Sequence, residues 1–314
     1  MQTSQSPIMP SGDQAPFYYA SFAGLWVYYL VPLNVLRNVL SLTAVGFTPY
    51  DFGGGMGLAN LNFMNYAGHS GSNNPQAYID ILQPVSPPNG PMPASLGVEG
   101  SNECEFNIVV APTARAAQTP VGLSVADYTA GNDHTKTIGN YRIGVPCDDR
   151  IAVYWGTVNF GENKIMTHPF MYNVPSPNNV GQTAWQFIVP GTVSESFAFD
   201  MKKFTCNPYM ISMLFDASNL VPTTSNASEI IDYSLFKENG MIRPVGSRRN
   251  LFGMFNAYDL SHTPPNAATL SFGNSTQPLT GVMGLVFGAG KPVAALTFQS
   301  QPAVAESSMY YVDL

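Results

Sequence analysis

One of the six lysines in this chain of 314 residues, Lys164, lies in a context that favours chemistry. It follows the apolar run 151–160 through a turn at residues 161–163, and the apolar pair Ile165 and Met166 comes directly after it. Apolar surroundings remove water from an ammonium group and so favour the neutral amine. A neutral lysine amine can attack a carbonyl carbon and form an imine. The segment therefore marks Lys164 as the lysine most suited to a functional role, with an ordinary position without chemistry as the alternative.

Two glutamates, Glu103 and Glu105, are the best candidates to transfer protons beside that amine. They are two positions apart in a run rich in β-branched and aromatic residues. They therefore share one face of an expected strand. A carboxyl group beside an imine can accept and return a proton. A solvated surface position for one of the two is the alternative.

The segment around Lys164 resembles the part of acetoacetate decarboxylases that carries their imine-forming lysine. The family has a glycine, seven further residues and then the lysine, and Gly156 and Lys164 have this spacing. Residues 160–164 are similar to the family's FGxPK pattern, with Asn163 in place of the proline. The resemblance implies that Lys164 is the nucleophile and that Phe160 lies beside the substrate.

Three further stretches match this family in the expected order. Residues 31–40 resemble its early helix, and residues 147–156 lead into the lysine segment as its strand order requires. Residues 101–110 resemble the strand that carries a catalytic glutamate, which assigns that role to Glu103, or to Glu105 if the register is shifted by one pair. The resemblance covers residues 17–215. It implies a mostly β (α+β) fold, in which a twisted antiparallel sheet forms a closed or double-layered barrel with a few short helices.

The chain also departs from the family pattern at positions that bind the substrate carboxylate. Ile165 replaces a second lysine, Phe22 stands near the place of an arginine, and Asn62 replaces a pocket glutamate. We therefore expect a pocket poor in cations, in which hydrophobic burial activates Lys164. The residues expected to bind substrate are Phe22, Asn62, Glu105, Phe160, His168 and Tyr172.

The pattern along the chain favours strands over helices. Residues 17–30, 57–68, 103–112, 141–160, 184–191, 196–204 and 209–216 are predicted as strands, and residues 31–42 as a short amphipathic helix. Residues 217–229 and 261–280 are rich in Ser, Thr, Asn and Pro and predict loops. We expect a loose arm at 1–16 and a single domain at 17–314, with insertions of unknown role at 71–98 and 217–280.

Composition limits the partners. The net charge is −7 and no basic run is present, which argues against nucleic acid. The apolar stretch 22–36 is interrupted and too short to cross a bilayer, and the segment 1–16 does not resemble a signal peptide. The four histidines lack metal-ligand spacing, and acidic neighbours disfavour a thiolate at Cys147. We expect a cytoplasmic homo-oligomer that acts on a small keto compound without a metal or cofactor.

Three functions fit these patterns. The first is a Schiff-base-forming lyase, of decarboxylase or of aldolase or dehydratase type, that acts through Lys164. The second is a non-catalytic binder of apolar metabolites on the same fold, which the missing arginine and second lysine favour. The third is a structural β-sandwich of capsid or lectin-like type, which suits the low charged fraction of 11%.

Overall fold

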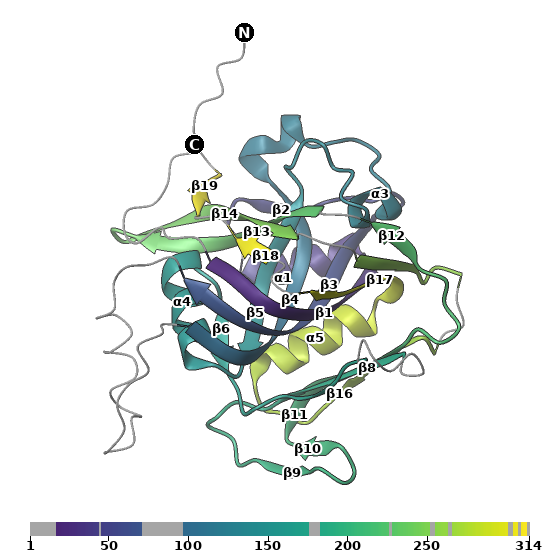
Figure 1. The fold of residues 1–314 in the computed structure, drawn as a ribbon. Helices are drawn as coiled ribbons and strands as arrows, with labels where there is room; N and C mark the ends of the chain where they lie inside the picture. The colour runs from purple at the N-terminus through teal and green to yellow at the C-terminus, as the bar shows by residue number, and fades with distance from the viewer. Residues whose placement is uncertain are drawn as a thin grey trace.

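The computed structural model describes residues 17–43, 45–70, 97–175, 183–225, 228–251, 255–262, 266–300, 304–306 and 309–312. The predicted arm at 1–16 and most of the predicted insertion at 71–98 lie outside these residues. Within them the fold is mostly β, with one large mixed sheet and few helices (Figure 1). The predicted mostly β architecture is therefore confirmed. None of the helices in the described part of the chain is long and apolar enough to cross a membrane.

The large sheet contains thirteen strands. They are β1 (Phe17–Pro32), β2 (Phe47–Pro49), β3 (Met56–Ser70), β4 (Gly97–Pro112), β5 (Gly139–Cys147), β6 (Lys164–Met166), β12 (Thr223–Ser225), β13 (Ser228–Glu238), β14 (Met241–Leu251), β15 (Phe255–Asp259), β17 (Lys291–Ser300), β18 (Val304–Glu306) and β19 (Tyr310–Tyr311). The sheet was predicted to be antiparallel, but β5 pairs in parallel with both β13 and β6. Its other pairings in the described residues are antiparallel.

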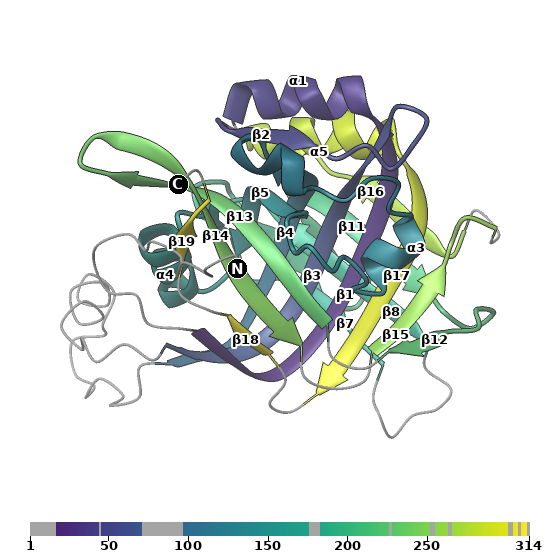
Figure 2. The same ribbon diagram turned by 90° about the horizontal axis from the view of Figure 1, so that it is seen from above.

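Seven of these strands form a circuit of neighbours. The pairings run from β1 to β3, β4, β5, β13, β14 and β18, and β18 pairs again with β1. In Figure 2, β13 and β14 lie in front of β1, β3 and β4 and run at an angle to them. Each of these strands therefore has one face that points into the circuit and one that points out of it.

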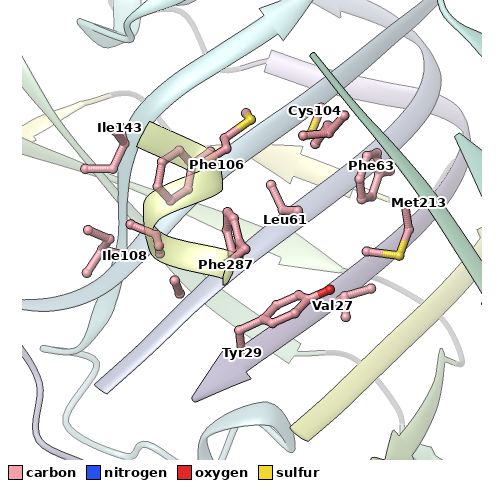
Figure 3. Close-up of a cluster of buried hydrophobic side chains, with 14 of the residues drawn as sticks. Val27, Tyr29, Leu61, Phe63, Cys104, Phe106, Ile108, Ile143, Met213 and Phe287 are labelled. Carbon is pink, nitrogen blue, oxygen red and sulfur yellow. The ribbon is translucent and has the colours of Figure 1, made fainter. Parts of the chain in front are cut away.

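The outer face of β1, β3 and β4 carries most of the apolar core. Val27 and Tyr29 of β1 and Leu61 and Phe63 of β3 project from this face and pack with Met213 and with other apolar side chains (Figure 3). A four-stranded sheet of β7 (Met171–Asn173), β8 (Ala184–Pro190), β11 (Tyr209–Asp216) and β16 (Ala268–Phe272) covers it, and a short pair, β9 (Ala198–Asp200) and β10 (Thr205–Asn207), extends from this layer.

The helices are short. They are α1 (Leu33–Thr43), a 3₁₀ helix (Thr113–Gln118), α3 (Val125–Thr129), α4 (Arg150–Phe160) and α5 (Pro278–Gly288). The predicted helix at 31–42 is confirmed as α1. In Figure 1, α5 lies between the large sheet and the four-stranded sheet.

The prediction of a strand over residues 141–160 is wrong for its second half, which forms α4. The Asp149 side chain caps the helix, because it accepts a hydrogen bond from the Ala152 amide at 2.8 Å. Such a cap satisfies one of the free amides at a helix start. Gly161 ends the helix in the left-handed conformation, with φ 61°, as is common for glycine after a helix. These two signals override the β propensity of Ile151, Val153 and Tyr154.

The prediction of loops at 217–229 and 261–280 is also partly wrong. The first range contains β12 and the start of β13, and the second contains β16 and the start of α5. The region 217–280, expected to be an insertion of unknown role, therefore supplies β13 and β14 to the circuit. These two strands also carry charged residues of the candidate site.

Candidate active site

Seven charged side chains meet inside the strand circuit, and none is more than 5% exposed. They come from six different segments: Glu103 and Glu105 (β4), Arg142 (β5), Glu162 (the turn after α4), Lys164 (β6), Asp232 (β13) and Arg249 (β14). We call them the charged cluster. Because side chains alternate between the faces of a strand, the neighbouring Cys104 and Phe106 of β4 point to the outer core instead.

Lys164 is held between two carboxylates. Its Nζ donates a hydrogen bond to Glu103 Oε2 and lies 3.2 Å from Glu162 Oε2. The Tyr66 hydroxyl donates to the same Glu103 oxygen at 2.9 Å. The side chain of Lys164 is 4% exposed, so this ammonium group is shielded from bulk water. Nζ is therefore in contact with two groups that can accept a proton from it.

The glycine of the Gly156–Lys164 pair has a steric role. The Lys164 side chain crosses α4 at Gly156, where an added Cβ would lie 2.9 Å from Lys164 Cγ and closer still to Lys164 Cε and Glu162 Oε2. The Gly-x₇-Lys spacing therefore places a residue without a side chain, Gly156, against the side chain of Lys164. It lets the end of the lysine reach Glu103.

Gly156→Ala is expected to displace Lys164 with little effect on folding, because the atoms it meets belong to flexible side chains. We expect the rate of imine formation with butanone, trapped by borohydride, to fall by roughly 10²-fold. Gly284→Ala is the matched control, since Gly284 is inside α5 with nothing within 4 Å of the added Cβ. It should raise the free energy of unfolding by about 0.4–1 kcal/mol and leave trapping unchanged. Equal rates in both variants would contradict the steric role.

The two arginines bind the remaining carboxylates. Arg142 Nη2 lies 3.1 Å from Glu105 Oε1 and 3.0 Å from Asp232 Oδ2, and Arg142 Nη1 donates to Glu162. Arg249 Nη2 lies 2.5 Å from Glu105 Oε1 and 3.2 Å from Asp232 Oδ2. Burial alone would raise the pKa of Glu105, but Arg249 and Arg142 outweigh it and hold that pKa well below its usual range.

Asparagine side chains complete the hydrogen bonding. Asn62 donates to Glu105 Oε2 at 3.0 Å, and Asn140 donates to Asp232 Oδ1 at 3.3 Å. Asn60 connects Asn140 with Asn107, since it donates to Asn140 at 2.9 Å and accepts from Asn107 at 2.9 Å. Buried carboxylates need such donors to compensate for lost hydration. The amides therefore hold the cluster in one arrangement.

Along the edge of β5 that faces away from β4, the strand changes its neighbour. β13 pairs with residues 140–141 and β6 with residues 145–147, so neither strand covers the middle of β5 on this side. A hydrogen bond from the Asn163 amide to the Ile143 carbonyl, at 2.9 Å, bridges this gap. A cavity of about 270 Å³ opens here, lined by Tyr141, Arg142, Ile143, Gly161, Glu162, Asn163 and Leu235. We call it the β5 cavity.

Two other cavities are less suited to the chemistry. A cavity of about 30 Å³ is lined mostly by aromatic and apolar residues, among them Trp26 and Tyr28, and also by Asp133 and Lys136. It has room for about one water molecule. A larger cavity of about 370 Å³ lies between α1 and α5 and is lined by Ile165. The Ile165 side chain points away from that of Lys164, its neighbour along β6. Of these three cavities, the β5 cavity is the one whose wall includes members of the charged cluster, Arg142 and Glu162, whereas Lys164 and Glu103 are not among its lining residues.

Most of the predicted site residues lie together. Lys164, Glu103, Glu105 and Asn62 are in or next to the cluster. Phe22 stacks on Tyr66 with a centroid distance of 6.5 Å, which places it on the same face.

The remaining three make other contacts. The ring of Phe160 is buried in the apolar cluster that includes Phe22, and its carbonyl accepts a hydrogen bond from Ser234. His168 Nε2 lies 2.9 Å from the Glu195 carbonyl and its ring stacks on Phe197 at 4.4 Å. Tyr172 is 41% exposed and stacks on Phe187. The structure brings neither His168 nor Tyr172 into contact with Lys164.

The expectation of a pocket poor in cations is wrong. Arg142 and Arg249 are buried in it, and neither lies in a stretch that matches the family's motifs. Sequence analysis also missed Glu162 and Asp232. A usable signal existed, because Arg142 is the one charged residue of β5 and Asp232 lies between the apolar residues Ile231 and Tyr233, and a charge in such a position seldom lacks a buried partner.

Cys147 is near the cluster but is not a second nucleophile. Burial raises the pKa of its thiol to about 12, with a further contribution from Glu103 that opposes the effect of Lys164. The thiol is therefore neutral at ordinary pH, as its acidic sequence neighbours predicted. In the described residues no group of three or more His, Cys, Asp or Glu side chains is arranged to hold a metal ion.

Comparison with known proteins identifies the fold. No protein-family model matches the chain, and no curated protein matches it in sequence. Solved structures do match. An acetoacetate decarboxylase-like enzyme from Sphingomonas wittichii RW1 is 12% identical with a TM-score of 0.52, and the match covers 96% of this chain and 92% of that chain. The enduracididine biosynthesis enzyme MppR complexed with pyruvate is 10% identical over 98% and 96% of the two chains, with a TM-score of 0.51. An acetoacetate decarboxylase from Legionella pneumophila subsp. pneumophila str. Philadelphia 1 is 10% identical over 98% and 93%, with a TM-score of 0.51.

Proposed function

We propose that this chain, which has the fold of acetoacetate decarboxylase-like enzymes, is a lyase that forms an imine between Lys164 and a small carbonyl compound. The observation that carries the proposal is the pairing of a buried lysine with Glu103, at the position where the resemblance requires a nucleophile. We take the circuit of strands to be the barrel that the resemblance implies. A single domain over residues 17–314, a homo-oligomeric state and a cytoplasmic location are parts of the same proposal.

Glu103 makes the amine reactive by taking a proton from it. The neutral Nζ then adds to the carbonyl carbon, and one amine proton moves to the carbonyl oxygen. Glu103 returns its proton to that oxygen, water leaves, and a protonated imine remains. This scheme replaces the expectation that hydrophobic burial activates Lys164, because the groups around Nζ are charged.

The protonated imine is an electron sink for the neighbouring carbon. A bond at that carbon can break heterolytically, because its electron pair moves into the C–N system. Glu103 Oε2, which contacts Nζ, is close enough to accept a proton from this carbon and return it. Tyr66 fixes the orientation of the carboxylate through its hydrogen bond.

Exchange of α-hydrogens for deuterium tests this function with a simple ketone. We expect the protein to accelerate the exchange of butanone in D₂O, followed by NMR, and Glu103→Gln to lower that rate by roughly 10²-fold or more. Tyr66→Phe is the control, because it keeps the carboxylate and removes one hydrogen bond of about 1 kcal/mol, worth roughly fivefold. A wild-type rate equal to that of buffer would count against the function.

The second candidate is a binder of apolar metabolites without catalysis. The ion pairs of Lys164 with two carboxylates favour it, since a lysine neutralised in this way can have a purely structural role. The same exchange experiment separates the two, because a binder gives no acceleration. The third function, a structural β-sandwich, has no support in the strand circuit or in its buried charges.

A further inference from the structure

We infer that the substrate is an uncharged aldehyde or ketone rather than a keto acid. The inference rests on the proposed imine function and concerns the charge of the molecule that the site accepts. It rests on the excess of carboxylates over cations inside the strand circuit, and on the carboxylates that already contact each cation there. It narrows the reaction to types that do not begin with loss of CO₂.

The charged cluster contains more acid than base. Three cations, Arg142, Lys164 and Arg249, face the four carboxylates of Glu103, Glu105, Glu162 and Asp232. All seven side chains are buried, so water screens their fields weakly. A substrate carboxylate would add a further negative charge to a region that already has an excess of one.

Each cation is also engaged by the protein's own acids. Both terminal nitrogens of Arg142 contact carboxylates, and Arg249 is bound by Glu105 through both of its terminal nitrogens. Lys164 lies between Glu103 and Glu162. A substrate carboxylate that paired with a terminal nitrogen of either arginine, or with Lys164 in place of Glu103 or Glu162, would displace an internal acid, which would then be left charged and buried without its partner.

The β5 cavity leads to the same conclusion. The wall of the β5 cavity contains one cation, Arg142, and one anion, Glu162, which are paired with each other. Its other lining residues are uncharged: Tyr141, Ile143, Gly161, Asn163 and Leu235. This lining suits a neutral molecule with an apolar body and a carbonyl group.

Without a carboxylate on the substrate, the enamine can form by loss of an α-proton, or by the reverse of aldol addition, in which a C–C bond breaks and a carbonyl compound leaves. In the protonated imine the α-hydrogen moves to Glu103 as a proton, and its electron pair forms the carbon–carbon double bond of an enamine. The enamine can then attack a second carbonyl carbon, or expel a β-hydroxyl group that leaves as water with the proton from Glu103. Aldol addition, its reverse and dehydration are therefore the reaction types that fit.

A comparison of the rates of adduct formation with methyl levulinate and with levulinate tests the preference for an uncharged substrate directly. Both probes contain the same ketone, and only levulinate is an anion near neutral pH. Borohydride trapping followed by mass spectrometry gives the rate of adduct formation at Lys164, and butylamine in solution corrects for the intrinsic reactivity of the ketones. We expect the corrected rate to be at least about tenfold higher with methyl levulinate, which corresponds to about 1.4 kcal/mol.

The outcomes separate this inference from the function on which it rests. An equal or faster rate with levulinate would overturn the inference and leave the imine function standing. No adduct with either probe would overturn both. Asp232→Asn, which removes one negative charge from the cluster without touching Lys164, should reduce the preference for the ester severalfold. An unchanged preference in a folded variant would count against the charge argument.

Discussion

Replacing Lys164 by alanine is expected to abolish the adduct that borohydride traps between the protein and butanone. The imine requires a primary amine inside the strand circuit, and Lys164 Nζ is the amine that contacts Glu103. Intact-mass measurement, with peptide mapping of the adduct, gives the result. Lys203→Ala is the matched control, because the Lys203 side chain is 79% exposed and pairs only loosely with Asp200, at 3.7 Å. That variant should form the adduct at the wild-type rate.

A second substitution excludes loss of folding as the cause. Lys164→Ala leaves Glu103 and Glu162 without their shared cation, which is costly in a buried site. Lys164→Arg keeps the positive charge but has no amine that forms an imine, so it should also give no adduct while retaining more of the stability. An adduct that persists in either variant, mapped to another lysine, would contradict the assignment of the nucleophile.

Arg249→Ala should lower the free energy of unfolding by about 3–5 kcal/mol, because it leaves Glu105 and Asp232 short of a cation partner in a buried site. The preceding residue, Arg248, gives the control because it is exposed. Arg248→Ala is expected to change stability by no more than about 0.5 kcal/mol. Denaturant titration of the three proteins measures the difference. A loss below about 1 kcal/mol in Arg249→Ala would mean that water reaches the cluster.

The effect of Arg249→Ala should depend on pH with a defined sign. In the wild type the pKa of Glu105 lies below its ordinary value of 4.5. Its ionised form therefore stabilises the fold above that pH, and this contribution is lost as the pH falls toward the folded value. With one arginine fewer, burial raises that pKa and less is lost on acidification. The difference in stability between the two proteins should therefore shrink from about pH 7 to about pH 3.

The parts of the fold that follow local rules were predictable. The aromatic and β-branched run of β1 and the helical spacing in α1 were found from sequence, whereas Gly156 and Lys164 were paired through the resemblance to the family pattern. The error at α4 shows where propensity fails. Asp149 and Gly161 are short capping signals, and they decide the structure of a mostly apolar run that would otherwise favour a strand.

The charged cluster could be predicted only in part, because it is assembled across the strand circuit. Glu103 and Lys164 were recognised through the resemblance, whereas Arg249 joins the cluster through Glu105 and Asp232 from a strand much later in the chain. Neither periodicity nor motif spacing reports such a distant contact. A single charge inside an apolar strand signals a buried partner, but it does not say which residue that partner is.

Because residues of the charged cluster share ion-pair partners, few single substitutions can accumulate there during evolution. Glu105 and Asp232 each bind both arginines, so the loss of either arginine removes one cation partner from two acids at once. A single substitution at one of these positions gives an unstable protein. A compensated pair of substitutions, such as a neutral residue at both Arg249 and Asp232, preserves the balance of charge in the cluster. New substrate preferences in descendants of this protein should therefore arise by paired replacements at these positions, or by changes in the uncharged wall of the β5 cavity.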